Sequence, residues 1–294
     1  MRIANIGGRA HLIKDEQALD IAEASDGSFG PSPQSLYDAW IEFATWAETI
    51  SVADHAEARA FSKAELDPPV PRPAQIFAVG LNYADHASES KLDLPENPIV
   101  FTKFVSSLTG ADVEVQLSGE TVDWEAELVA VVGTGGRDIA EEDAWKHLAG
   151  LTIGQDLSDR TVQWWGPPAQ FSLGKSLAGF APVGPWVVSV DEIANDHALD
   201  DLRISCTLTE PNGSERVLQN GRTGAMIFSI PRLIARLSAV VELLPGDLIF
   251  TGTPAGVGMG RTPAEYLRPG QTLTTEIEGI GSIVQRFVGI AAAA

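Results

Sequence analysis

The sequence predicts a mainly β protein of the α+β class, with a small N-terminal α/β domain at residues 1–70 and a larger β domain at residues 71–294. From about residue 72 onward, short runs of strand-forming residues dominate, and Gly, Pro and Asn separate them. Few long helical patterns interrupt these runs, so strands and helices do not alternate regularly. This pattern argues against a doubly wound parallel sheet and against a TIM barrel.

The N-terminal region combines a hairpin with a helix. Residues 2–13 are strand-like on both sides of Gly7-Gly8, a pair typical of a tight hairpin turn. Apolar residues then recur at spacings of three and four between Leu36 and Ile50, which predicts one amphipathic helix with a buried stripe. The segment "DPPVPRPAQ" is too rich in proline for a helix or a central strand. We therefore expect a linker there and a domain boundary near residue 70.

The larger region contains a series of runs with strand composition. They are "AQIFAVGL", "NPIVFTKF", "DVEVQL", "AELVAVVG", "ISCTLTE", "DLIFTGTP" and "SIVQRFVG". The clearest helical patterns are "AEEDAWKHLAG" and "SIPRLIARLSAV". This region is therefore expected to be mainly sheet.

The composition argues against several partners. A formal net charge of −20 repels nucleic acid and anionic membranes. No run of 18 apolar residues is present, so we expect no transmembrane helix, and the first residues lack the apolar core of a signal peptide. The single cysteine, Cys206, excludes an internal disulfide and a cysteine-rich metal site. We expect a cytoplasmic protein, in which local cations must reverse the field if the substrate is an anion.

The stretch "DWEAEL" places two glutamates, Glu125 and Glu127, in a run with the composition of a half-buried strand. Side chains alternate along a strand, so these two share a face, and Ala126 and Leu128 lie on the other. Two ionised carboxylates side by side repel each other. A solvated strand face explains the pair if both are exposed, and a cation between them explains it if they are not.

A third carboxylate follows the apolar run "LTIG", which ends at Gln155 and Asp156. An aspartate at the end of a strand is well placed to face a cleft. Together with Glu125 and Glu127 it forms an all-oxygen set without His or Cys. Such hard ligands suit Mg²⁺, Mn²⁺ or Ca²⁺ rather than zinc.

Further motifs carry chemistry. In "GLNYADHASES", His86 and Glu89 are three residues apart, so on a helix they form either a water-activating dyad or an ordinary solvated face.

Lys175 lies in the apolar tract "FSLGKSLAGFAP", where it must find a carboxylate or a substrate anion. Ser172 and Lys175 match the S-x-x-K pattern of serine acylases, but the companion S-D-N and K-T-G elements are absent. The glycine-rich "FTGTPAGVGMG" is not a P-loop, and its "TGTP" offers exposed backbone N–H groups, together with threonine hydroxyls, to a carboxylate.

Taken together, these segments resemble the fumarylacetoacetate hydrolase family. The motifs run in family order from about Ile76 to Val288. They are "GLNYADHASE", "FTKFVSSLTG", "DWEAEL", "QDLSDR", "FSLGKS", "GDLIFTGTPAGVG" and "IEGIGSI". One departure is visible, because Gln155 stands where the family commonly has Asn, and we expect little effect on ligation from it.

The resemblance implies a mixed β-roll with a divalent ion, Mg²⁺ or Mn²⁺, at its mouth, and a homodimer. It also implies roles for residues that match the family motifs. The implied metal ligands are Glu125, Glu127 and Asp156, and the implied catalytic residues are His86 and Glu89 on a lid and Lys175. The implied substrate contacts are Tyr83, Lys103, Arg160, Gln163 and Thr253.

The family acts on 1,3-dicarbonyl compounds, and this resemblance leads us to expect a metal-dependent hydrolase. It would cleave a C–C bond in an acylpyruvate or a 2,4-diketo acid, with water activated by His86 and Glu89. An oxaloacetate decarboxylase or an isomerase of the same family is the alternative, since neither needs an activated water. A metal-stabilised module that binds a small acid without turnover is the non-enzymatic alternative. In each case the partner is a small anionic keto acid.

Overall fold

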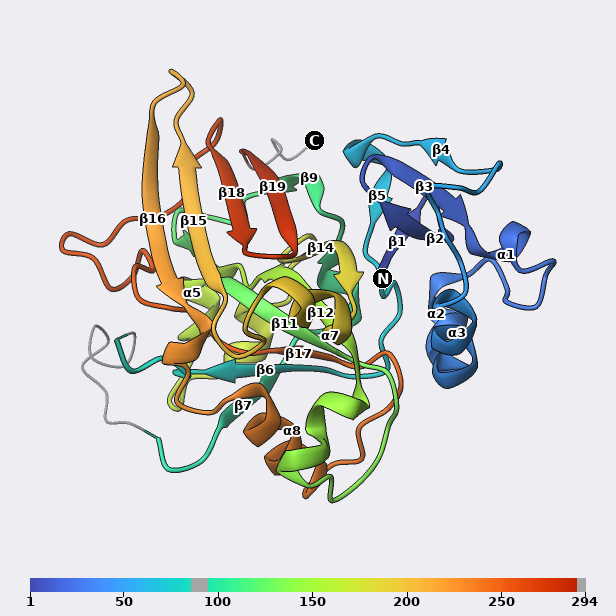
Figure 1. Cartoon of the computed structure of the whole chain (residues 1–294). Coiled ribbons are helices and arrows are strands. Elements are labelled where there is room, and N and C mark those ends of the chain that lie inside the picture. Colours follow the sequence, from blue (N-terminus) through green and yellow to red (C-terminus); the bar gives the residue numbers. More distant parts are fainter. Residues whose placement is uncertain (86–94, 290–294) are drawn as a thin grey trace.

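The computed structural model describes residues 1–85 and 95–289. It confirms a mainly β protein of the α+β class, built from mixed sheets (Figure 1). The large sheet has the spatial order β4 (Arg59–Ala60), β3 (Gln17–Asp20), β2 (Arg9–Lys14), β1 (Arg2–Ile6), β14 (Ala181–Val188), β12 (Leu148–Gln155), β11 (Ala126–Val132), β17 (Leu248–Phe250), β6 (Ile76–Gly80) and β7 (Ile99–Thr102). Two short strands lie off this path, where β5 (Leu66–Asp67) pairs with β1 and β8 (Leu108–Thr109) with β14.

A five-stranded sheet packs against this sheet. Its order is β16 (Glu215–Arg222), β15 (Arg203–Thr209), β18 (Thr272–Ile277), β19 (Gly281–Val288) and β9 (Asp112–Gln116). The orange hairpin of β15 and β16 marks it in Figure 1. One continuous core joins the two sheets, with Leu128 and Ile153 from the large sheet and Ile204, Leu273 and Phe287 from the smaller one. A two-stranded ribbon of β10 (Val122–Asp123) and β13 (Ser158–Asp159) completes the β structure of the described residues.

The helices are short and peripheral. The α-helices are α1 (Ile21–Ala24), α2 (Pro33–Asp38), α3 (Trp40–Ala47), α5 (Arg160–Gln163), α6 (Phe171–Gly174), α7 (Val190–Asp196) and α8 (Ile230–Ser238). The 3₁₀ turns are η1 (Lys63–Glu65), η2 (Val105–Ser107), η3 (Glu141–His147) and η4 (Thr223–Ala225). Within the described ranges, no helix has the length and apolar character needed to cross a membrane.

The N-terminal hairpin is confirmed, and the single N-terminal helix is wrong. Gly7 and Gly8 form the turn between β1 and β2, at φ 57° and 82°, a region that glycine enters without steric cost. The helical pattern is divided into α2 and α3, because Ala39 adopts φ −124° and ψ 39°. Leu36 and Phe43 nevertheless bury in the same core cluster, so the apolar spacing reports burial rather than helix continuity.

The large sheet crosses the predicted domain boundary. Residues 68–75 contain no helix or strand, as their proline content predicts. However, β1 pairs antiparallel with β14, so backbone hydrogen bonds tie the N-terminal hairpin to the following region. The division into two domains at residue 70 stays a prediction.

The pairing of β11 with β12 positions the acidic residues. The two strands are antiparallel, with Ala126 opposite Gln155. This register brings the start of β11 beside the end of β12. Every residue of β11 is buried, so the expected half-buried strand is wrong, and both of its faces pack against protein.

Candidate active site

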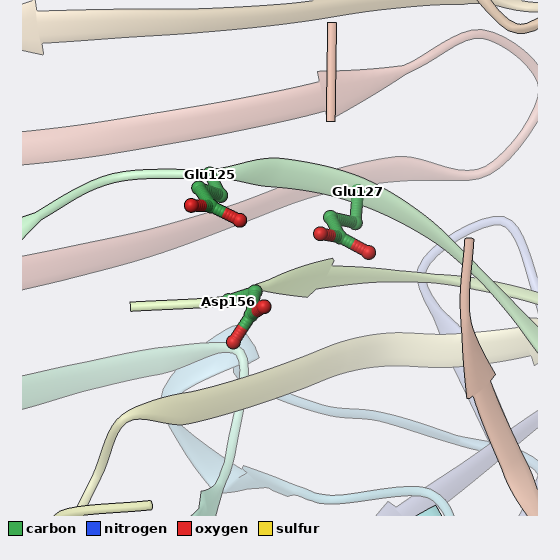
Figure 2. Close-up of side chains that lie close together, drawn as sticks. All are labelled: Glu125, Glu127 and Asp156. Atoms are coloured by element: carbon green, nitrogen blue, oxygen red, sulfur yellow. The ribbon is translucent and has the colours of Figure 1, made fainter. Parts of the chain in front are cut away.

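Three carboxylates converge where β11 begins and β12 ends. Glu125 directly precedes β11, Glu127 is its second residue, and Asp156 follows β12 (Figure 2). One ligand oxygen from each lies within 4.8 Å of the others. The exposed fractions of these residues are 8%, 1% and 0%. A solvated strand face is therefore excluded as the explanation of the glutamate pair.

The donor set fits a single hard cation. An ion held at about 2.0–2.6 Å from each oxygen separates opposite ligands by at most about 4–5 Å, which matches the size of this cluster. Glu127 accepts a hydrogen bond from the Gly252 N–H at 2.7 Å but has no ion-pair partner among residues 1–85 and 95–289. Burial, followed by the charges of Asp156 and Glu125, raises the pKa of Glu127 well above its usual range. A divalent ion would relieve that repulsion.

Two buried lysines contact the same carboxylates. Lys175 Nζ donates to Glu125 Oε2 and to Asp156 Oδ2, both at 2.7 Å. Lys103 Nζ donates to Asp156 Oδ1 at 2.5 Å and to the Lys175 carbonyl. Burial lowers the pKa of Lys175, but Asp156 and Glu125 outweigh it and raise that pKa above its usual value. Burial dominates for Lys103 and lowers its pKa. Of the two expected partners of Lys175, a carboxylate or a substrate anion, the structure confirms the carboxylate.

Arg160 is held by protein carboxylates, and its predicted contact with the substrate stays a prediction. Its Nε and Nη2 donate to Asp123 Oδ2 at 2.9 and 2.7 Å, and Nη2 also donates to Glu125 Oε1 at 2.8 Å. Its Nη1 donates to Gln163 Oε1 at 2.8 Å, so the predicted contact from Gln163 is also engaged within the protein. The reason is electrostatic, because two buried carboxylates need this cation. Arg160 therefore orients Glu125.

Tyr83 remains a candidate substrate contact. It is 1% exposed, and its hydroxyl has no hydrogen-bond partner within the part of the chain that the structure describes. Burial and the nearby Glu127 charge raise the pKa of this phenol. The preceding Asn82 fixes its backbone, since Asn82 Nδ2 donates to the Phe228 and Thr251 carbonyls at 3.0 and 2.8 Å. A neutral, anchored hydroxyl beside the carboxylates is suited to donate to a ligand.

The hydroxyl of Thr253 in "TGTP" is engaged within the protein, and its predicted contact with a substrate carboxylate stays a prediction. Thr253 is 2% exposed. Its Oγ1 donates to the Ala126 carbonyl at 2.8 Å and accepts from Gln219 Nε2 at 2.7 Å. This hydroxyl therefore supports the backbone between the two glutamates.

The remaining residues named from the sequence are His86, Glu89 and Cys206. His86 and Glu89 fall outside the described residues. Burial raises the pKa of the Cys206 thiol to about 12, which agrees with an inert cysteine.

Sequence reasoning missed Asp123, and it named Gln155 without foreseeing its contact with Glu125. Asp123 accepts from Arg160 and from the N–H groups of Gly258 and Met259. The i, i+2 spacing that identified the two glutamates extends back to Asp123, so a signal for it was present. Gln155 Oε1 accepts from the Glu125 N–H at 3.0 Å. No local pattern could show that contact.

Known proteins match this chain over most of its length. The model of the fumarylacetoacetate (FAA) hydrolase C-terminal family matches residues 75–288. The human mitochondrial oxaloacetate tautomerase FAHD2A is 41% identical over 222 residues, which are 75% of this chain and 68% of that protein.

Solved structures share the fold over nearly the whole chain. A Mycobacterium smegmatis crystal structure has 50% identity and a TM-score of 0.89, covering 98% of this chain and 99% of that one. Maleylpyruvate hydrolase from Sphingobium sp. SYK-6, solved with manganese(II) and pyruvate, has 25% identity and a TM-score of 0.77, covering 98% and 99%. With the family model matched over residues 75–288, which contain the acidic cluster, this chain belongs to the fumarylacetoacetate hydrolase family.

Proposed function

We propose that this protein is a metal-dependent keto–enol tautomerase of a small 2-keto dicarboxylic acid, with oxaloacetate as the first candidate. The observation that carries the proposal is the buried contact of Lys175 Nζ with two of three clustered carboxylates. The 41% identity to a human oxaloacetate tautomerase supports it. Tautomerisation therefore replaces C–C hydrolysis as the leading function.

Glu125, Glu127 and Asp156 would hold Mg²⁺ or Mn²⁺. When bound, the ion supplies a Lewis acid that stabilises negative charge on a keto oxygen. The carboxylates also hold Lys175 in place, so one set of residues organises both the cation and the proton carrier.

The reaction needs only a proton transfer. One C–H bond breaks at the CH₂ between the keto group and the distal carboxylate, and one O–H bond forms at the keto oxygen. In the reverse, enol-to-keto direction that the assay follows, the charged Lys175 Nζ donates a proton to that carbon, the enol O–H releases its proton to solvent, and Lys175 regains a proton from solvent. The Tyr83 hydroxyl donates a hydrogen bond to the substrate. Lys103 holds the Lys175 backbone and Asp156. No water is consumed and no C–C bond breaks.

The test follows enol oxaloacetate by its absorbance, with Mn²⁺-loaded protein and a chelator-treated control. Loss of the enol faster than in buffer, without release of pyruvate, is expected. Pyruvate release at the same rate would instead indicate decarboxylation. A protein that binds Mn²⁺ and leaves the enol decay at the buffer rate would refute the tautomerase proposal.

C–C hydrolysis is the second candidate, because the sequence keeps the His86 and Glu89 pair. An acylpyruvate panel, monitored for both cleavage products, tests it. The His86→Ala variant should lose hydrolysis and retain tautomerisation, since only hydrolysis needs an activated water. A binding module would show Mn²⁺ binding and neither turnover.

The assembly and the location stay predictions. A homodimer can be tested by light scattering of the purified protein. The cytoplasmic location predicted from the sequence can be tested by fractionation, and the human relative is by its name mitochondrial.

A further inference from the structure

The backbone around Glu125 lies at the margin of the strand ladder. On one edge of β11, β17 pairs only with Val129–Val131. On the other edge, the ladder with β12 ends at Ala126 opposite Gln155. The N–H groups of Glu125 and Ala126 are buried, and buried N–H groups must have partners. The hydrogen-bond acceptors for these two N–H groups therefore have to come from side chains.

Two glutamines provide those partners from opposite edges. Gln155 Oε1 accepts from the Glu125 N–H at 3.0 Å, and Gln219 Oε1 accepts from the Ala126 N–H at 3.0 Å. Consecutive N–H groups of an extended chain point to opposite edges, so these contacts hold the strand from both sides. Rotation of the Glu125 backbone about the strand axis is thereby restrained, and the direction of its side chain with it.

Both carboxamides are themselves fixed. A backbone N–H only donates, so each Oε1 must face it and each Nε2 must face away. Gln155 Nε2 donates to Thr275 Oγ1 at 2.7 Å, on β18. Gln219 Nε2 donates to Thr253 Oγ1 at 2.7 Å and to the Pro254 carbonyl at 2.8 Å. The two glutamines are 0% and 1% exposed, and water does not compete for these bonds.

We propose that Gln155 and Gln219 are positioning residues that hold Glu125 in the geometry of a metal ligand. Gln219 lies on β16 and Gln155 is tied to β18, so the five-stranded sheet supports the acidic cluster through these two amides. The inference rests on the metal-binding part of the proposed function. It also gives Gln155, the residue where the family commonly has Asn, a role that depends on its length.

We call Gln155 and Gln219 the clamp residues. The test shortens each of them by one C–C bond, with the variants Gln155→Asn and Gln219→Asn. A loss of about 1.5 Å of reach prevents the carboxamide from meeting both of its partners at once. The Mn²⁺ dissociation constant, measured by electron paramagnetic resonance of free Mn²⁺, should rise roughly 10- to 100-fold in each variant. Thermal unfolding in chelator reports the metal-free stability of the same proteins.

Gln285→Asn is the matched control. Gln285 is 0% exposed, lies on β19 and donates through Nε2 to the Ala111 carbonyl, not to a residue of the acidic cluster. This control should lose stability yet keep the native Mn²⁺ dissociation constant. The proposal is overturned if the control loses Mn²⁺ as strongly as the clamp variants, or if both clamp variants keep native affinity. The two variants act from different strands, so a folding failure of one leaves the other decisive.

The outcomes also separate this inference from the proposed function. A native protein that binds no Mn²⁺ removes the metal site, and the clamp with it. A native protein that binds Mn²⁺ without tautomerising oxaloacetate overturns the activity alone, while the comparison of dissociation constants still decides the clamp.

Discussion

Replacing Lys175 with methionine tests the centre of the site. Met has a similar length and no charge, so Lys175→Met removes the cation that bridges Glu125 and Asp156. Each contact is 2.7 Å long, which corresponds to about 6 kcal/mol of Coulomb attraction at an effective dielectric constant of about 20. Desolvation offsets much of this, and removing one partner of a buried ion pair costs about 3–5 kcal/mol.

That loss has a measurable size. At about 2.1 cal/mol/K of unfolding entropy per residue, it lowers the Tm of this 294-residue chain by roughly 5–8 °C in chelator. The tautomerase rate of the Mn²⁺-loaded variant should fall about 10²- to 10⁴-fold, because the proton carrier is gone. Lys146→Met is the control, since its side chain is 77% exposed and its removal should leave Tm and rate unchanged. A Lys175→Met protein with native Tm and native rate would refute both roles of this lysine.

Three further changes test the site and the fold. Glu127→Gln should abolish Mn²⁺ binding in titration and raise Tm in chelator, because it removes a buried ionisable carboxyl that burial and the Asp156 and Glu125 charges disfavour; native Mn²⁺ affinity contradicts its role. Arg160→Met should lower the free energy of unfolding by about 3–5 kcal/mol in a denaturant titration, because Asp123 loses its cation; a native value contradicts the buried pairing. Burial raises the pKa of Asp20, but hydrogen bonds from Arg9 and the Glu23 N–H outweigh it and lower the pKa below 3.8. Asp20 therefore stabilises the fold above pH 3.8 and loses this contribution as pH falls through its lower folded value, so Asp20→Asn should be less stable than the native protein near pH 7 and similar to it at the acid end.

Local sequence patterns carried much of the fold class and the identity of the acidic residues. Strand composition and turn residues predicted the mainly β region and the N-terminal hairpin, since these depend on near neighbours. The two-residue period of a strand placed Glu125 and Glu127 on one side, and an abrupt end of an apolar run identified Asp156. The apolar spacing between Leu36 and Ile50 predicted burial but missed the break at Ala39, because a buried stripe survives a change of chain direction.

The sequence by itself determined which donor atoms are available: three carboxylates, two lysines and a tyrosine, each recognisable from its motif. The tertiary structure decided which of these groups contact one another. The antiparallel register of β11 with β12 brings Asp156 to the glutamates. Asp123 and Glu125 accept hydrogen bonds from Arg160. Gln155 and Gln219 accept hydrogen bonds from the backbone on the two edges of the strand. These outcomes are physical consequences of burial, because a buried charge or N–H takes its partner from whichever segment the fold brings near, however distant that segment is in the chain.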